Sequence, residues 1–139
     1  MTLTRTVLAA SMAAVAFAGC TSAPRPARPA AAASVTLTAP DSGREVALVS
    51  GQRLVVSLAA NPTTGYQWAL VNAGGLVPVG EPAYTPDAAA PGTVGSGGTS
   101  VWTFAAERPG RGTLRLAYGR AFEPGVPPAE TFEVPVVVP

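Results

Sequence analysis

Apolar and polar residues alternate with a period of two over most of the chain after Ser34. Successive side chains of a β-strand point to opposite faces, so this alternation predicts strands with one buried face. Five runs carry the pattern, and their inward positions are Leu54, Val56 and Leu58; Tyr66, Trp68 and Leu70; Ser100, Trp102 and Phe104; Leu114, Leu116 and Tyr118; and Phe132, Val134, Val136 and Val138. Weaker runs cover 35–38, 44–49 and 76–79.

Residues typical of turns separate these runs. They lie at 40–43, 50–52, 61–65, 72–75 and in a long Gly/Ala/Pro stretch at 87–98. About seven or eight short strands at this spacing predict an all-β fold, an immunoglobulin-like antiparallel β-sandwich. Pro135 interrupts the last run, which predicts an edge strand or a bulge at that position.

The first 19 residues have the pattern of an export signal. Arg5 precedes an apolar run at 7–17, and the small pair Ala18-Gly19 precedes Cys20. The apolar run is shorter than the roughly 20 residues that a membrane-spanning helix needs. Its ending resembles the bacterial lipobox, which implies a signal peptide over 1–19 and lipidation of Cys20 as the first residue of the mature protein. Plain secretion after cleavage nearby, with Cys20 a free thiol, is the alternative.

Residues 20–34 form a predicted tether. They are rich in Ala, Pro and Arg and contain no aliphatic side chain larger than Ala, so they have little to bury against a core. The foldable domain is therefore expected over 35–139. A lipidated Cys20 predicts a lipoprotein of the cell envelope, on the periplasmic face of the outer membrane in a bacterium with two membranes. Without lipidation the protein would be secreted.

The composition excludes several kinds of chemistry. The chain of 139 residues has nine basic and eight acidic residues, a net charge of +1, and all nine basic residues are Arg. A nucleic-acid binder would need a basic stripe, which this sequence lacks. Without His or Lys there is no imidazole base, no His-liganded metal and no Schiff base, so we expect no metal, no cofactor and no enzymatic activity. A hydrolase that uses only carboxylates remains an alternative, although the eight acidic residues are scattered singly.

Three loops stand out from the ordinary turns. The first, Asn61-Pro62-Thr63-Thr64-Gly65-Tyr66, combines a fixed proline dihedral with a flexible glycine and side chains that can bond the nearby backbone. Taken alone it could be an ordinary turn. The second contains Gly95, Gly97 and Gly98 but lacks the Lys-Ser or Lys-Thr of a phosphate loop. The third places Arg120 and Phe122 on a turn, where the aromatic ring could anchor a partner or fold under its own loop.

In type and order these loops resemble those of the chagasin-like inhibitors of papain-family cysteine peptidases, a family of immunoglobulin-like sandwiches. Its signature is an Asn-Pro-Thr-Thr-Gly-aromatic loop, a Gly-X-Gly-Gly loop and an Arg-Pro-Trp-like loop. Residues 61–66 match the first loop fully and residues 95–98 match the second. In the third loop Arg120 is in place, whereas Ala121 stands for Pro and Phe122 for Trp.

The resemblance implies a reversible, monomeric inhibitor whose three loops wedge into the cleft of a papain-family cysteine peptidase. By position, the loop from Asn61 to Tyr66 would meet the catalytic cysteine, Gly95, Gly97 and Gly98 would line one wall, and Arg120 and Phe122 the other. The alternative is an envelope lipoprotein whose sandwich binds glycan or another envelope protein. Trp68 and Trp102 would be the binding aromatics of that alternative, although their alternation places them in the core.

Overall fold

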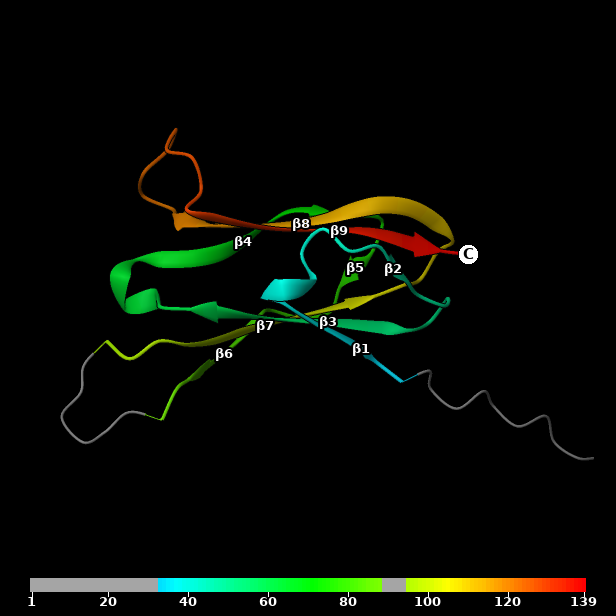
Figure 1. Ribbon diagram of the computed structural model, residues 1–139, viewed down its shortest axis with the longest axis horizontal. Coiled ribbons are helices and arrows are strands. Elements are labelled where there is room, and N and C mark those ends of the chain that lie inside the picture. Colours follow the sequence, from blue (N-terminus) through cyan, green and yellow to red (C-terminus); the bar gives the residue numbers. More distant parts are fainter. Residues whose placement is uncertain (1–32, 89–94) are drawn as a thin grey trace, which may run out of the picture.

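The computed structural model describes residues 33–88 and 95–139, which form two facing β-sheets (Figure 1). One sheet contains β1 (Val35–Thr38), β3 (Arg53–Ala60), β5 (Val77–Pro78), β6 (Ala83–Pro86) and β7 (Gly98–Ala105). The other contains β2 (Val46–Ala47), β4 (Tyr66–Ala73), β8 (Gly110–Arg120) and β9 (Glu130–Val138). Two short 3-10 turns, η1 (Ala39–Asp41) and η2 (Pro62–Thr64), lie between strands. The predicted all-β sandwich is confirmed.

The sheets are mixed rather than purely antiparallel. The strand orders are β1-β3-β7-β5, with β6 also on β7, and β2-β9-β8-β4. Most pairs are antiparallel, as predicted, but β1 pairs parallel to β3 and β2 parallel to β9, which departs from the antiparallel prediction at these two pairs. A parallel pair needs a crossover connection, which the chain provides by passing from β1 in one sheet to β2 in the other before it returns to β3.

The core lies between the sheets and is built mainly from the predicted inward positions, to which Leu37, Leu48, Leu76 and Ala106 are added. Leu54 faces Phe104 across β3 and β7, and Leu116 faces Phe132 across β8 and β9. The side chains that share the buried cluster are Leu37, Leu48, Leu54, Val56, Leu58, Leu76, Phe104, Ala106, Leu114, Leu116, Phe132, Val134, Val136 and Val138. Among the described residues, this cluster extends from Leu37 to Val138.

Some strands differ from the sequence prediction. The weak runs at 44–49 and 76–79 shorten to the two-residue strands β2 and β5, and β6 was not predicted at all. All four residues of β6 are exposed and one is Pro86, so no alternation marks this strand. Pro135 does not lie on an outer strand, because β9 is flanked by β8 and β2. The carbonyls of Glu133 and Val137 accept hydrogen bonds on the side of β9 that faces β2, and Pro135 lies between them with the same orientation. The proline nitrogen, which has no hydrogen to donate, therefore faces β2, where the pairing of β9 covers only two residues.

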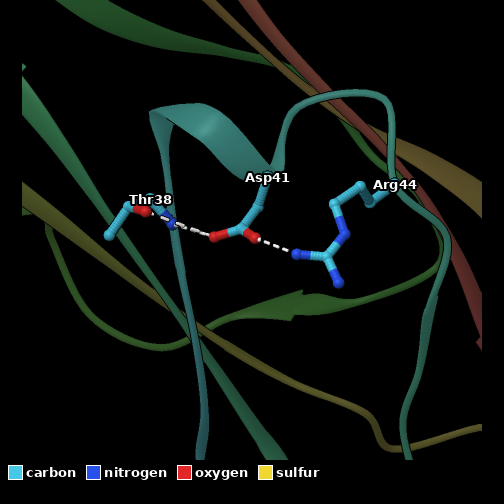
Figure 2. A network of polar contacts seen from close by, with 3 residues as sticks. All are labelled: Thr38, Asp41 and Arg44. Carbon is cyan, nitrogen blue, oxygen red and sulfur yellow. Dashed lines mark hydrogen bonds and ion pairs between the residues drawn. The ribbon is translucent and has the colours of Figure 1, made fainter.

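A small polar network holds the turn that carries the chain from β1 toward β2 (Figure 2). The Asp41 carboxylate accepts hydrogen bonds from the backbone N–H of Thr38 at 2.9 Å and from its hydroxyl at 3.2 Å. The Arg44 guanidinium donates to the other carboxylate oxygen at 2.8 Å. These donors, led by the Thr38 backbone N–H, lower the pKa of Asp41 because they stabilise its charged form.

Candidate functional site

Three connections meet at one end of the sandwich. Strands β3 and β8 run toward this end, and their antiparallel partners β7, β4 and β9 run away from it. The connection from β3 to β4, the segment before β7 and the connection from β8 to β9 therefore gather at the left of Figure 1, whereas the C-terminus lies at the right. The structure thus brings the three predicted loops to the same end.

The first loop is a tight turn fixed by its own side chains. The segment from Pro62 to Thr64 forms η2, and Gly65 follows with φ of 81°, a left-handed conformation that favours glycine. The Thr64 hydroxyl donates to the Asn61 carbonyl at 2.7 Å, and the Thr63 hydroxyl donates to the Asn61 side-chain oxygen. Pro62, Thr63 and Thr64 are all exposed. The loop therefore presents a stiff, solvent-facing tip, as the sequence predicted.

Asn61 connects this loop to its surroundings. Its backbone N–H donates to the Tyr118 hydroxyl at 2.9 Å, and its side-chain amide donates to the Gly95 carbonyl at 3.1 Å. Tyr118 also packs against the rings of Tyr66 and Trp68, with centroid distances of 5.4 and 5.0 Å. Asn61 therefore ties the first loop both to the second loop and to the end of β8.

The second loop lies beside the first, but its glycines differ in their surroundings. Gly95 has φ of 84°, and a Cβ atom there would lie 3.7 Å from the Thr63 hydroxyl. At Gly97 a Cβ atom would lie 3.3 Å from the Ala60 carbonyl oxygen. Gly98 is buried within β7, beneath the Tyr84 ring. Gly95 and Gly97 are thus on the loop side of the site, whereas Gly98 is enclosed by its own sheet.

The third loop touches the first through both of its predicted site residues. Arg120, the last residue of β8, donates from Nε to the Thr64 carbonyl at 3.2 Å. The Phe122 side chain is 68% exposed, yet its ring edge lies over Gly65, where a Cβ atom would come within 2.9 Å of it. Phe122 therefore combines the two alternatives left by the sequence, since it is exposed on one side and packed on the other.

Two residues at this end were not singled out from the sequence. Tyr118 was predicted as an inward position rather than as a site residue, but its hydroxyl accepts a hydrogen bond from the first loop. Tyr84 lies on the unpredicted strand β6, and with Pro62, Tyr66 and Trp68 it lines a cavity of about 260 Å³ between the sheets. The sequence signal for Tyr118 was its place as the last inward residue of an alternating run, whereas nothing in the local sequence marked Tyr84.

At one end of the sandwich the first loop is hydrogen-bonded to each of the other two. Loops held by a rigid scaffold are where binding residues of such folds commonly lie. The family model for the Chagasin family peptidase inhibitor I42 matches residues 47–136. The chain therefore belongs to the chagasin family of peptidase inhibitors. This confirms the resemblance seen in the loop sequences.

Known relatives agree with this assignment. Amoebiasin-1 of Entamoeba histolytica is 31% identical over 90 residues, which cover 65% of this chain and 86% of that protein. The crystal structure of the cysteine protease inhibitor EhICP2 from Entamoeba histolytica matches with a TM-score of 0.68 at 21% identity, covering 77% of this chain and 96% of that one. PbICP-C, solved in complex with falcipain-2, matches with a TM-score of 0.54 at 18% identity, covering 76% and 99%. At these identities the two structures establish the shared fold.

Proposed function

We propose that this domain reversibly inhibits papain-family cysteine peptidases by inserting its three loops into the active-site cleft. The observation that carries the proposal is the bonding of the first loop to both neighbours, through Asn61 to Gly95 and through Arg120 to Thr64. Loops that are already held in place by these bonds lose little conformational entropy when they dock, which favours tight binding. The exposed tip at Pro62, Thr63 and Thr64 would lie over the catalytic cysteine.

The family and its relatives support the same class of partner. The matched family consists of peptidase inhibitors, EhICP2 is a cysteine protease inhibitor, and PbICP-C forms a complex with falcipain-2. In the proposed complex Gly95 and Gly97 face one wall of the cleft and Phe122 the other. The buried position of Gly98 favours a supporting role for this residue rather than a direct contact.

Titration of papain with a soluble form comprising residues 34–139 tests the proposal. This form retains all the residues of the core cluster that the structure describes. We expect tight, reversible inhibition that is weakened in a Thr63→Ala, Thr64→Ala double variant, because both hydroxyls hold the turn. A Thr36→Ala variant, whose exposed side chain lies on β1 in a different part of the sandwich, serves as the control and should inhibit like the wild type. A folded wild-type domain that leaves papain and related peptidases fully active would refute the proposal.

The positions of the two tryptophans do not favour the glycan-binding alternative. Both rings are partly buried and pack against the core. Trp68 donates its indole N–H to the Ala59 carbonyl at 2.9 Å, and the indole nitrogen of Trp102 is buried. A carbohydrate platform needs an aromatic face open to solvent, so these rings act mainly in packing.

We also propose that Cys20 is lipidated and holds the inhibitor at the cell envelope. Residues 1–32, including Cys20, lie outside the described residues. The chain enters the sandwich through β1, which runs parallel to β3 and so begins at the end opposite the three loops. There the Gln52 side chain donates to the Ala33 carbonyl at 2.7 Å. An anchor that precedes Ala33 would therefore leave the loops directed away from the membrane.

Expression of the full chain and of a Cys20→Ala variant in a bacterium with a lipoprotein pathway tests the anchor. We expect the wild type in the membrane fraction with an intact mass that includes acyl chains, and the variant in the soluble fraction. A mature wild-type protein without acyl mass would instead support plain secretion.

A further inference from the structure

The guanidinium of Arg120 is already surrounded by groups of its own chain. Its Nε donates to the Thr64 carbonyl at 3.2 Å, and its Nη1 donates to the Glu123 carboxylate at 3.2 Å. Its Cζ lies 4.5 Å from the centroid of the Tyr66 ring and 5.8 Å from that of Phe122. These distances are typical of cation–π contacts. Arg120 therefore links Thr64 and Tyr66 of the first loop to Phe122 and Glu123 of the third loop.

The charge of Arg120 is matched within the domain. Arg120 and Glu123 form an ion pair, and both side chains are only about one third exposed, at 33% and 36%. A peptidase carboxylate that approached Arg120 would have to compete with Glu123. Since the guanidinium presents its donors in a rigid planar fork, it can hold the Thr64 carbonyl and the Glu123 carboxylate at the same time.

Phe122 completes the contact from the other side. Its ring edge lies over Gly65, which has the left-handed conformation that ends η2. A shift of Gly65 out of this conformation would move it away from the ring, and would also move the Thr64 carbonyl, which is bonded to the Gly65 nitrogen, away from Arg120. The conformation of the turn and the position of the third loop are thus mutually dependent.

We infer that Arg120 is a positioning residue, which fixes the turn at residues 62–65 in its docking conformation before a peptidase binds. This inference rests on the proposed inhibitory function but assigns Arg120 a different role from the wall contact implied by the family resemblance. If only a fraction of free molecules held the loop in the docking conformation, apparent affinity would fall in proportion to that fraction. Loss of Arg120 therefore slows association with the peptidase, whereas loss of a direct contact would mainly speed dissociation.

Amide hydrogen exchange of the free domain tests this role without any peptidase. The reporters are the N–H groups of Thr64 and Gly65, which donate to the carbonyls of Asn61 and Pro62. Arg120→Ala should speed their exchange by about tenfold or more, in proportion to the open fraction. Arg111→Ala, which removes an exposed arginine at the other end of β8, should leave both rates unchanged.

Two further variants separate the parts of the contact. Glu123→Gln removes the ion pair but leaves the bond from Arg120 to Thr64, so exchange should rise less than in Arg120→Ala. Arg120→Lys keeps the charge but lacks the planar fork, and should restore only part of the protection. If Arg120→Ala lowers the thermal midpoint of the whole domain, amide exchange in Arg120→Lys is compared with that of the wild type instead. Unchanged exchange at Thr64 and Gly65 in the folded variant would overturn the inference.

Association and dissociation rates with papain complete the test. We expect Arg120→Ala to lower the association rate in proportion to the fraction of molecules that still hold the docking conformation, with a smaller change in dissociation. A faster dissociation rate with unchanged exchange in the free domain would assign Arg120 to direct contact and overturn the positioning role. If wild-type protein does not inhibit papain, the proposed function fails, whereas the exchange experiment still decides whether Arg120 holds the loop.

Discussion

The phenol ring of Tyr84 lies against the backbone of Gly98. A Cβ atom at position 98 would come within 2.6 Å of the Tyr84 hydroxyl oxygen and would clash with the Thr85 carbonyl oxygen. Tyr84 and Thr85 belong to β6, which pairs with β7 at the edge of its sheet. The glycine at 98 therefore allows β6 to close over the start of β7, next to the second loop.

Gly98→Ala should lower the free energy of unfolding by about 1–3 kcal/mol, the usual effect of overpacking against a backbone that cannot move freely. Thermal or urea unfolding measures the change. Gly119→Ala is the matched control, because a Cβ there meets only Pro128 at an ordinary 3.8 Å, and its stability should stay within about 0.5 kcal/mol of the wild type. Equal stability of the two variants would contradict a close contact between Tyr84 and Gly98.

Asn61→Asp should weaken peptidase inhibition by about tenfold, equivalent to roughly 1.4 kcal/mol. The carboxylate cannot donate to the Gly95 carbonyl, so the bond between the first and second loops is lost. The inhibition constant against papain gives the effect. As a control, Asn72→Asp keeps its acceptor for the Gly74 N–H and adds the same charge at the other end of β4. If both variants weakened inhibition equally, a general charge effect would explain the result.

Phe122→Ala should weaken inhibition by more than about tenfold, since an interface aromatic contributes about 2 kcal/mol or more. The change removes an exposed ring and uncovers Gly65. Val71→Ala removes another exposed apolar side chain, 58% accessible, on β4 away from the loops and should have no effect. Phe122→Trp should change the order of affinities across a panel of related peptidases, because the indole adds surface and an N–H donor. An inhibition constant that is insensitive to Phe122→Ala would rule out this role.

Asp41→Asn should destabilise the domain near neutral pH but not in acid. The Thr38 backbone N–H, assisted by the Thr38 hydroxyl and Arg44, lowers the pKa of Asp41 in the folded state. A carboxyl whose pKa is lowered on folding adds stability above its unfolded pKa and loses it as pH falls through the folded value. The difference in thermal midpoint between wild type and variant should therefore be present at about pH 7 and shrink below about pH 3.9. A difference that stays constant into acid would show that the charge of Asp41 does not contribute.

The local sequence determined the layers of this protein and the type of its loops. The alternation at Leu54, Val56 and Leu58 fixed which face of β3 is buried, because a period of two is a property of the strand itself. Likewise Pro62 and Gly65 already specified a stiff turn, since each restricts or permits backbone angles without help from distant residues. The loop motifs, together with their order, also indicated the chagasin family.

Only the tertiary structure decided which groups meet. The bond from Arg120 to Thr64 joins residues 56 positions apart, and the burial of Gly98 under Tyr84 depends on a strand that no alternation marks. The parallel pairing of β1 with β3 likewise follows from the path of the chain between the sheets. Such contacts depend on strand order and register, which the packing of the whole core selects and no local pattern encodes.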